Sequence, residues 1–460
     1  MNLKEFLRYR CEKPLYALIG DPVEHSVSPE MHTGIYKADG IEAKYIPIHL
    51  KPDEMPAFIE AARRKLKGFN VTIPYKTEII KYLDIVEGTA GSLKSVNTVL
   101  VENGKLAGFN TDIIGVEETL SRNGVSAEGK NAVILGNGGA SRTIAFVLCN
   151  NGASVTVCGR DIERVKSFID DLSLKNADIN AASFGYLDLR KIDILVNATP
   201  VGMFPKEDAL PADINIAPNL SFVYDTIYNP LETKLIKYAK NAGIRCANGL
   251  SMLIAQGVAS DEIWFGRKIS EAAVTNAHQT LAARVAAKRL AEKHGKRNIV
   301  LAGFMGCGKT TVGKVLSKRL GFTFYDLDRK IEKEEGKSIT EIFASYGEEY
   351  FRALEYKYIQ GLAALTNNVI SLGGGAILRR DNFEVLTPNG LVVYLKAGTE
   401  FLYNNIKKGK NRPLMKTEDP KKRVIELFEE RRPLYEAHCN ISVNAEKDVE
   451  NVADDIINML

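Results

Sequence analysis

A glycine-rich run in the second half of the chain has the spacing of a phosphate-binding loop. The run "GFMGCGKT" (303–310) fits the pattern G-x-x-x-x-G-K-[ST] at every fixed position. It follows the strand-like "NIVLA" and precedes the helix-like "TVGKVLSKRL", which is the context that the motif requires. In such a loop Lys309 bridges the β- and γ-phosphates of ATP and Thr310 ligates Mg²⁺. The residues expected around the nucleotide are Gly303, Met305, Gly306, Cys307, Gly308, Lys309, Thr310 and Thr311.

A second glycine-rich turn lies far upstream, in "ILGNGGA" (134–140). Its spacing departs from G-x-G-x-x-G, but it also stands between an apolar strand, "NAVIL", and a helical stretch. Glycines there allow a pyrophosphate to approach the backbone, and the helix N-terminus supplies N–H donors. The sequence therefore predicts a dinucleotide site, as an alternative to an ordinary glycine turn. The residues expected to form it are Gly136, Asn137, Gly138, Gly139 and Ala140.

The next strand, "SVTVCG", ends with "RDIER" and so indicates which dinucleotide binds. NAD sites usually place an acidic residue at this point, where it accepts hydrogen bonds from the ribose hydroxyls. Here Arg160 takes that place and Arg164 follows one turn later. Because a guanidinium suits a 2′-phosphate, the pattern favours NADP over NAD. The alternative is that both arginines are ordinary surface charges beside Asp161 and Glu163.

Composition limits the class of protein. The chain has 460 residues, 45% of them apolar and 26% charged, with a net charge of +4 and six scattered cysteines. The length suggests about three domains. The small net charge gives no reason to expect nucleic acid or a membrane surface as a partner. With no C-x-x-C pair, no apolar run of about 20 residues and no signal-peptide pattern, we expect a cytoplasmic protein with free thiols.

The segments that must position these turns alternate between strand-like and helix-like patterns. Strands are expected at 14–20 and 43–50, and a helix at 28–40 with Ser28 as its N-cap. From about residue 130 the alternation becomes regular, which implies a parallel sheet with helices on both faces. An alanine-rich helix over 268–294 precedes the second phosphate-binding strand.

Several longer motifs in the first part of the chain occur together and in order. The segments "GDPVEHSVSPEMH", "FNVTIPYK", "SVNT", "GFNTD" and "GLSMLIAQG" resemble shikimate dehydrogenase over roughly residues 13–285. The resemblance implies reduction of 3-dehydroshikimate to shikimate with NADPH. It makes Lys76 and Asp112 catalytic, and the sequence leaves open whether Lys76 delivers the proton or stabilises the developing charge. The residues implied to bind substrate are Ser26, Ser28, Thr72, Asn97, Asp112, Tyr228 and Gln256, with Thr199 near the cofactor.

The residues downstream of the ATP loop indicate which kind of molecule accepts the phosphate. In "FYDLD" (324–328) we expect Asp326 and Asp328 on the same side of an extended strand end. Further on come "GEEYFRALE", "VISLGGGA", the basic stretch "KKGKNRPLM" and "ERRPLY". Together these segments resemble shikimate kinase over roughly residues 297–460.

The resemblance to shikimate kinase also implies roles. Asp328 would bind the acceptor hydroxyls and could act as base, while Asp326 would hold the water shell of Mg²⁺, with Thr310 as the other metal residue. Arg352 and Arg431 would grip the substrate carboxylate. Arg412 would reach the transferring phosphoryl group from a lid. The three glycines implied to let the backbone approach the ring are Gly373, Gly374 and Gly375.

We therefore predict an α/β protein that reduces 3-dehydroshikimate and then phosphorylates shikimate, using NADP(H), ATP and Mg²⁺. A substrate-binding α/β domain (1–112 and 250–290) would combine with a Rossmann-like NADP domain (113–249). A linker (291–297) would lead to a P-loop kinase domain with a central parallel sheet (298–460). The alternatives are a different small-molecule P-loop kinase, or a non-catalytic ATP-binding module, fused to the dehydrogenase. Monomer and homodimer both stay open.

Overall fold

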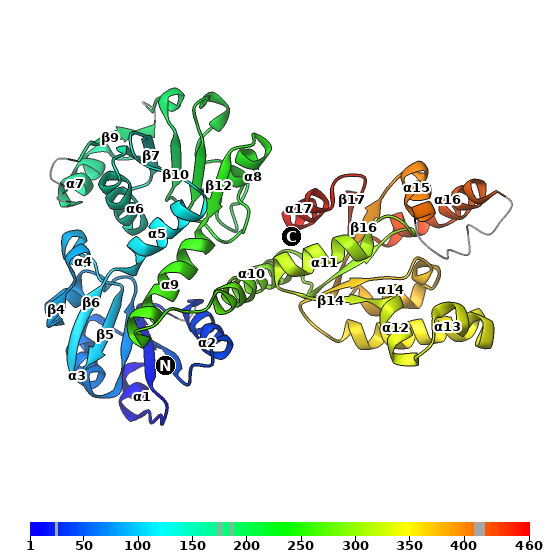
Figure 1. Ribbon diagram of the computed structural model, residues 1–460, viewed down its shortest axis with the longest axis horizontal. Coiled ribbons are helices and arrows are strands. Elements are labelled where there is room, and N and C mark those ends of the chain that lie inside the picture. The colour runs from blue at the N-terminus through cyan, green and yellow to red at the C-terminus, as the bar shows by residue number, and fades with distance from the viewer. Residues whose placement is uncertain (24–25, 173, 175–176, 185–186, 409–418) are drawn as a thin grey trace. The chain divides into compact units, whose positions relative to one another are not determined.

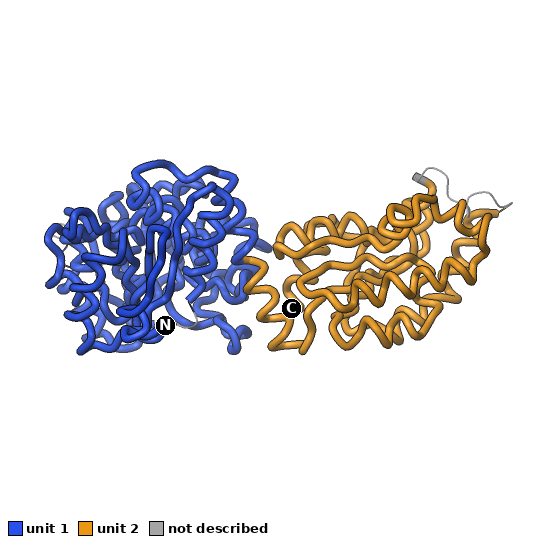
Figure 2. Tube along the Cα trace, turned by 90° about the horizontal axis from the view of Figure 1, so that it is seen from below, with its two compact units in different colours: residues 1–281 blue, residues 282–460 orange. Residues whose placement is uncertain are grey.

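The computed structural model describes residues 1–23, 26–172, 174, 177–184, 187–408 and 419–460. The chain divides into two compact units, Met1–Leu281 and Ala282–Leu460, coloured separately in Figure 2. The division falls within helix α10 (Glu271–His294). The predicted linker therefore comprises the end of this helix and the residues before the next strand. The domain boundaries drawn from the sequence stay predictions.

The first unit begins with a mixed sheet of strand order β2-β1-β3-β5-β6-β4 (Figure 1). β1 pairs in parallel with β2 and β3, whereas β5 pairs antiparallel with β3 and β6. Every residue of β1 is buried, as its unbroken apolar sequence predicts. The strands are β1 (Leu15–Gly20), β2 (Lys44–His49), β3 (Gly68–Val71), β4 (Ile85–Val86), β5 (Thr98–Glu102) and β6 (Lys105–Phe109), and the helices are α1 (Leu3–Arg8), α2 (Ser28–Ala38), α3 (Met55–Lys65) and α4 (Gly88–Leu93).

The start of α2 differs from the sequence expectation. The N-cap of this helix is Val27, with no side-chain capping bond, so the prediction that Ser28 is the cap is wrong. The reason is local: the hydroxyl of Ser26 accepts the Ser28 N–H at 3.2 Å, which makes a serine turn just before the helix. Ser28 therefore occupies the first helical position.

The second part of this unit is an all-parallel sheet of order β12-β11-β10-β7-β8-β9. The order reverses between β7 and β10, which makes a switch point at their carboxyl ends. Helices α5 (Thr111–Arg122) and α9 (Gly249–Phe265) pack against each other between the two sheets (Figure 1). The remaining elements are β7 (Asn131–Leu135), α6 (Gly139–Asn150), β8 (Ser154–Gly159), α7 (Ile162–Leu172), β9 (Ile179–Ser183), β10 (Ile194–Asn197), β11 (Phe222–Asp225), α8 (Lys234–Asn241) and β12 (Arg245–Asn248).

The second unit has an all-parallel sheet of order β14-β15-β13-β16-β17. Its central strand β13 is fully buried and leads through the phosphate loop into α11. The elements are β13 (Asn298–Ala302), α11 (Lys309–Leu320), β14 (Thr323–Asp326), α12 (Leu327–Glu335), α13 (Ile339–Ala363), β15 (Asn368–Ser371), α14 (Arg380–Leu386), β16 (Gly390–Lys396), α15 (Thr399–Lys408), α16 (Pro420–His438), β17 (Ile441–Asn444) and α17 (Val449–Met459). Short 3₁₀ helices cover Pro52–Glu54, Glu78–Tyr82, Leu189–Lys191, Ile214–Ile216 and Ala376–Leu378.

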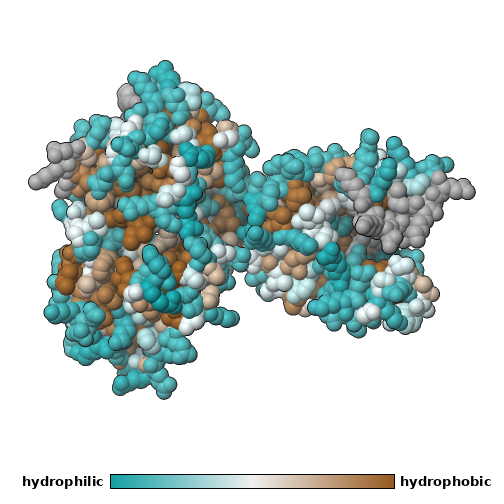
Figure 3. Space-filling model, viewed as in Figure 1, coloured by the Kyte–Doolittle hydropathy of each residue, from teal (hydrophilic) through white to brown (hydrophobic). Residues whose placement is uncertain are grey.

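On the face drawn in Figure 3, hydrophilic and hydrophobic residues are intermixed. The predicted α/β class and the central parallel sheets are confirmed, with one local error. Residues 324–328 do not form an extended strand end. β14 stops at Asp326, whose side chain accepts the Arg329 N–H and caps α12, so Asp328 lies in the first helical turn. Residues with small polar side chains favour such caps, and this preference overrides strand alternation here.

Candidate active sites

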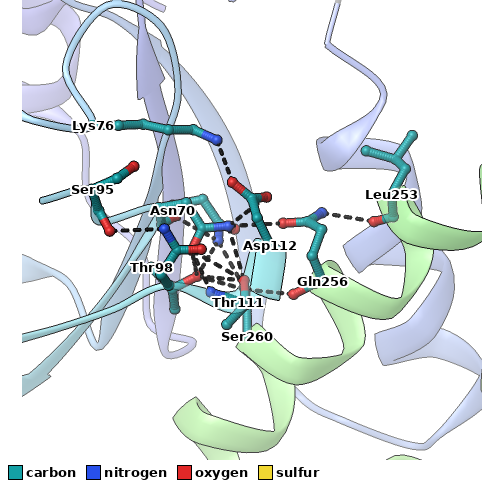
Figure 4. A network of polar contacts seen from close by, with 11 residues as sticks. Asn70, Lys76, Ser95, Thr98, Thr111, Asp112, Leu253, Gln256 and Ser260 are labelled. Carbon is teal, nitrogen blue, oxygen red and sulfur yellow. Dashed lines mark hydrogen bonds and ion pairs between the residues drawn. The ribbon is translucent and has the colours of Figure 1, made fainter. Parts of the chain in front are cut away.

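Four predicted residues of the first unit form one hydrogen-bonded network at an edge of the mixed sheet (Figure 4). Lys76 Nζ lies 2.6 Å from Asp112 Oδ2. Asn97 Nδ2 donates to the other carboxylate oxygen of Asp112 at 2.9 Å and to Gln256 Oε1 at 3.4 Å. The Lys76 side chain is 31% exposed and that of Asp112 is 14% exposed, so the pair lies at a surface that a ligand can reach. The network therefore offers a cation and a carboxylate held in a fixed geometry.

The sheet topology explains why these residues meet. β3 ends just before Thr72, β5 begins just after Asn97, and β6 ends just before the turn that leads to Asp112. Because β5 is antiparallel to both neighbours, these three points lie at the same edge of the sheet. Gln256 reaches this edge from α9. One sheet edge thus gathers side chains from distant parts of the sequence.

A buried polar layer, which was not predicted from the sequence, supports the network. Thr98 Oγ1 and Ser260 Oγ lie 2.8 Å apart, and Asn70 Nδ2 donates to both at 3.0 Å. The Asn97 side-chain oxygen accepts the Thr111 N–H at 2.7 Å. All of these side chains are buried, and together they restrict the orientation of Asn97. Only their position inside the quoted motifs could have drawn attention to Asn70, Thr98 and Thr111.

The two predicted serines lie after β1. The hydroxyl of Ser26 donates to that of Ser28 at 3.2 Å, so the structure brings the pair together. Thr72 packs against Gly20, because a Cβ atom on this glycine would overlap the Thr72 methyl group. β1 and β3 are parallel, with Ile19 paired to Val71, so the serine turn and Thr72 both follow the carboxyl ends of neighbouring strands. The carboxyl ends of parallel strands are where α/β sheets commonly bind ligands.

The upstream glycine turn joins β7 to α6 as predicted. Gly136 has φ +105°, and a Cβ atom there would lie 2.8 Å from the Ala198 carbonyl oxygen, so only glycine fits without displacement. A Cβ atom on Gly138 or Gly139 would meet nothing within 4 Å, so the helix N-terminus is open. Ala140 is exposed, and the Asn137 side chain lies near Gly159 at the end of β8. The turn therefore has room for a phosphate over the N–H groups of α6.

The two predicted arginines follow β8 and are exposed. Arg164 Nε lies 3.4 Å from Asp161 Oδ2, with both side chains more than half exposed. The Asp161 side chain also accepts the Glu163 and Arg164 N–H groups and so starts α7. Arg160 comes directly after β8, and β8 pairs with β7, the strand that leads into the glycine turn.

Two more predicted residues lie in the loops after β10 and β11. Thr199 donates its hydroxyl to Asn197 Oδ1 at 2.7 Å and its hydroxyl oxygen accepts the Val201 N–H. Tyr228 lies in the loop after β11 and is partly buried. These loops follow β10 and β11. In the sheet, β7 lies between these two strands and β8, so the glycine turn after β7 separates the two loops from Arg160 after β8.

The second unit holds a cavity of about 500 Å³ around the phosphate loop. Lys309 Nζ donates to the Gly303 carbonyl at 2.6 Å, and Thr310 Oγ1 donates to Asp326 Oδ2 at 2.6 Å. The structure thus brings together the two residues predicted at the metal. Cys307, within the loop, is buried. The cavity lining includes Met305, Gly306, Cys307, Gly308, Lys309, Thr310, Thr311, Asp326, Asp328 and Gly374.

The predicted acceptor residues gather around the glycine run 373–375, and Asp328 and Gly374 also line the cavity. A Cβ atom on Gly373 would lie 2.5 Å from Asp328 Oδ1, and one on Gly375 would overlap the Arg352 guanidinium. Arg431 Nη1 donates to the Gly374 carbonyl at 3.1 Å. The glycine run therefore lets the backbone lie directly against an acid and two arginines. Burial, followed by the charge of Asp326, raises the pKa of Asp328, while Lys309 and Arg352 oppose the shift.

The buried carboxylate of Glu355 was also missed. It is 1% exposed, and its Oε2 accepts from Arg352 Nη1 at 2.9 Å. Burial raises the pKa of Glu355, with Arg352 opposing the rise. The helical spacing of three residues after Arg352 could have indicated this contact. Arg412, predicted in the lid, lies outside the residues that the structure describes.

Within the described ranges, no cluster of three or more His, Cys, Asp or Glu side chains is placed to hold a metal ion. No helix in those same ranges has both the length and the apolar character needed to cross a membrane. All six cysteines are free.

A glycine turn at the switch point of a parallel sheet, together with a lysine–carboxylate pair, defines a dinucleotide-dependent oxidoreductase in the first unit. The second unit is a P-loop kinase. Four family profiles agree with this division. The shikimate dehydrogenase substrate-binding domain matches residues 18–99, shikimate/quinate 5-dehydrogenase 118–203, the shikimate 5′-dehydrogenase C-terminal domain 249–277, and shikimate kinase 305–460.

Individual relatives also match the first part of the chain to shikimate dehydrogenases. A shikimate dehydrogenase (NADP(+)) of Methanococcus maripaludis is 42% identical over 258 residues, which are 55% of this chain and 92% of the relative. That of Methanocaldococcus jannaschii is 40% identical over 257 residues, 54% and 90% of the two chains. A crystal structure of the Thermus thermophilus shikimate 5-dehydrogenase with NADP(H) and shikimate is 32% identical, has a TM-score of 0.52 and covers 58% of this chain and 99% of that one.

The chain therefore belongs to the shikimate dehydrogenase family and carries a shikimate kinase domain in its second unit. It joins two enzymes of the shikimate pathway in one polypeptide.

Proposed function

We propose that the first unit reduces 3-dehydroshikimate to shikimate with NADPH, and that Lys76 and Asp112 handle the proton. The observation that carries this proposal is the 2.6 Å pair between Lys76 Nζ and Asp112 Oδ2. When the ketone is reduced, negative charge develops on its oxygen, and an ammonium group beside that oxygen stabilises the charge or donates the proton. Asp112 keeps the Lys76 amine in place, and Asn97 in turn fixes Asp112.

The groups around this pair match a small ring that carries hydroxyls and a carboxylate. Thr72, Asn97 and Gln256 supply hydroxyl and amide groups for the ring hydroxyls. Ser26 and Ser28 supply two hydroxyls beside the start of α2, where an anion is favoured. Tyr228 approaches the same substrate from the loop after β11. Support comes from the topology, which places the serine turn, Thr72 and Asn97 at one sheet edge.

The residues of the upstream turn fit NADP(H). The open space above Gly138 and Gly139 accepts a pyrophosphate at the N-terminus of α6, with Asn137 and Ala140 alongside. Arg160 and Arg164 would hold the 2′-phosphate, and Thr199 would lie near the nicotinamide. When bound, the reduced cofactor supplies the hydride. The chain's own residues bind and orient it.

For the second unit we propose transfer of a phosphoryl group from Mg-ATP to the 3-hydroxyl of shikimate. Lys309 and the loop N–H groups would bind the phosphates, and Thr310 with Asp326 would hold Mg²⁺ and its waters. Asp328 would accept the hydroxyl proton, which suits a carboxyl whose pKa is raised. Arg352 and Arg431 would bind the carboxylate of shikimate, and Gly373, Gly374 and Gly375 leave room for the ring.

The two halves can be tested separately. Purified protein should oxidise NADPH only when 3-dehydroshikimate is present, and should release ADP from Mg-ATP when shikimate is present. ADP release with gluconate or a nucleoside monophosphate, but not with shikimate, would favour a different kinase. A lack of ADP release with any acceptor would favour a non-catalytic ATP-binding module. We further propose a cytoplasmic location, which the free cysteines support. Sedimentation would decide between monomer and homodimer.

A further inference from the structure

Two buried polar residues end neighbouring strands beside the glycine turn. Asn197 is the last residue of β10 and Asp225 is the last residue of β11. They are directly paired in the parallel register, and neither has any exposed surface. Asn197 Nδ2 donates to Asp225 Oδ1 at 3.0 Å. No catalytic or binding role assigned above uses either side chain.

The Asp225 carboxylate accepts three hydrogen bonds, and two of them come from the loop that follows its own strand. The Ile227 N–H donates to Oδ1 at 3.1 Å, and the Thr233 hydroxyl donates to Oδ2 at 2.6 Å. Thr233 also accepts the Ile236 N–H and so caps α8. One carboxylate therefore fixes both ends of the loop from 226 to 233.

Asn197 connects the same carboxylate to the loop after β10. Its Oδ1 accepts both the N–H and the hydroxyl of Thr199, at 3.1 and 2.7 Å. Its Nδ2 also donates to the Val201 carbonyl at 3.1 Å. A backbone bond from Phe204 N–H to the Asn229 carbonyl joins the two loops further out. The loops from 198 to 204 and from 226 to 233 are thus held as one assembly, with the Asn197–Asp225 pair at its base.

This assembly stands at the switch point of the parallel sheet. Ala198 packs so closely on Gly136 that a Cβ atom there would be 2.8 Å from its carbonyl oxygen. In doubly wound sheets a dinucleotide lies across the carboxyl ends of the strands at this point. Arg160, which is proposed to hold the 2′-phosphate of the adenosine half, follows β8 on one side of the glycine turn. The adenosine half of the cofactor is therefore expected on that side. The nicotinamide half then lies over β10 and β11, above the two loops.

We propose that Asp225 is a positioning residue for the nicotinamide half of the cofactor. It acts through Asn197, Ile227 and Thr233, holding the two loops in the geometry that hydride transfer needs. The inference rests on the proposed NADPH reduction. Because Asp225 is fully buried, it touches neither cofactor nor substrate.

The chemistry of the pair suits this role. Burial raises the pKa of Asp225 to about 6, while its three hydrogen bonds oppose the rise. At neutral pH the group is therefore mostly ionised and can accept from all three donors. An asparagine at the same position keeps one oxygen for Asn197 and Ile227, and its amide can donate to Thr233. An alanine leaves the Ile227 N–H and the Thr233 hydroxyl without this acceptor and removes one of the two bonds of Asn197 Nδ2, a change that typically weakens local structure.

The experiment compares Asp225→Ala, Asp225→Asn and the control Asp213→Ala. Asp213 is an exposed carboxylate in the same sheet domain that caps a 3₁₀ helix through the Asn215 N–H. Dehydrogenase kcat and KM are measured for both substrates. NADPH affinity is measured separately by fluorescence titration, and hydrogen exchange of the two loops is measured without ligand. Kinase turnover reports on the integrity of the other unit.

We expect Asp225→Ala to weaken NADPH binding by about ten-fold or more, which is the effect of losing roughly one to two buried hydrogen bonds. It should also lower kcat and speed exchange at the Thr199, Val201 and Ile227 amides. The KM for 3-dehydroshikimate should rise less than the KM for NADPH, because Tyr228 is the one proposed substrate residue in these loops and the Lys76 network lies outside them. Asp225→Asn should recover most of the NADPH affinity, and Asp213→Ala should match the wild type.

Unchanged NADPH affinity and loop exchange in Asp225→Ala would overturn the inference. An Asp225→Asn variant as defective as the alanine variant would also overturn it. If Asp225→Ala does not fold, Thr233→Val is used instead, because it removes the hydroxyl that donates to Asp225 Oδ2. Hydrogen exchange of the two loops that is the same in Thr233→Val as in the wild type would also overturn the inference. A wild-type protein that fails to oxidise NADPH would instead refute the proposed function. The two failures are therefore distinguishable.

Discussion

Lys76 Nζ and Asp112 Oδ2 lie 2.6 Å apart, although 36 residues separate them in the chain. The pair depends on the mixed sheet, because Lys76 follows β3 and Asp112 follows β6, and β5 between them is antiparallel to both. Asn97, just before β5, completes the arrangement by donating to the same carboxylate. The residues that we place at the ketone are therefore held by backbone pairing as well as by their own charges.

Replacing Lys76 should separate the two activities. Lys76→Ala should lower dehydrogenase kcat by about 10²–10⁴-fold, because it removes the group that stabilises or protonates the developing alkoxide. Kinase turnover should not change. Lys105→Ala is the control, since Lys105 is an exposed lysine at the opposite end of β6. Steady-state kinetics with both substrate pairs gives the result, and a loss of both activities would indicate misfolding instead.

Arg160 should set the cofactor preference. Arg160→Ala should raise the KM for NADPH by about ten-fold or more, since charge-assisted hydrogen bonds to the 2′-phosphate are lost. The KM for NADH should change little, because NADH lacks that phosphate. Arg190→Ala is a suitable control, as Arg190 is exposed and pairs with Asp188 away from the glycine turn. Equal effects on both cofactors would show that Arg160 does not bind the 2′-phosphate.

Glu355 should matter to the kinase more than Glu348 does, although both bond Arg352. Glu355 is buried, whereas Glu348 is 65% exposed, so water screens only the second pair. We expect Glu355→Gln to raise the KM for shikimate by about ten-fold without raising the KM for ATP. Glu348→Gln should change it by less than about three-fold. Similar effects from both substitutions would contradict the proposed role of the buried pair.

Asp225 should also make the stability of the first unit depend on pH. Its pKa is raised in the folded protein from 3.8 to about 6, so its contribution is fully present below the unfolded pKa and is lost as pH rises through the folded one. The unfolding free energy of the wild type, minus that of Asp225→Asn, should therefore fall by about 2 kcal/mol between pH 4 and pH 7. Trp264 is the only tryptophan of the chain and is buried in the first unit, so its fluorescence follows this transition. A constant difference across this range would contradict the raised pKa.

The sequence predicted the regular elements well where a local pattern determines them. The strands at Asn131–Leu135, Ser154–Gly159 and Asn298–Ala302 follow from short apolar runs with glycine turns, and the structure has them at those positions. The prediction failed where two local preferences compete. Asp326 could continue a strand or cap a helix, and its acceptance of the Arg329 N–H decides for the helix.

The supporting residues could not be predicted because their contacts join distant parts of the chain. Asn70 and Ser260 are 190 residues apart, and neither has an unusual neighbour in sequence. Asn197 and Asp225 meet only because β10 and β11 are adjacent and in register. Family motifs pointed to the groups expected to touch substrate, whereas these buried partners become visible only when strand pairing is known.

One chain is proposed to perform both reactions in succession. A single mixture of the protein with 3-dehydroshikimate, NADPH and Mg-ATP tests this succession. We expect NADPH oxidation, ADP release and the appearance of shikimate 3-phosphate. Removal of ATP should stop the sequence at shikimate, and Lys309→Ala should do the same. Accumulation of shikimate with no shikimate 3-phosphate in the complete mixture would show that the chain does not phosphorylate the shikimate that it makes.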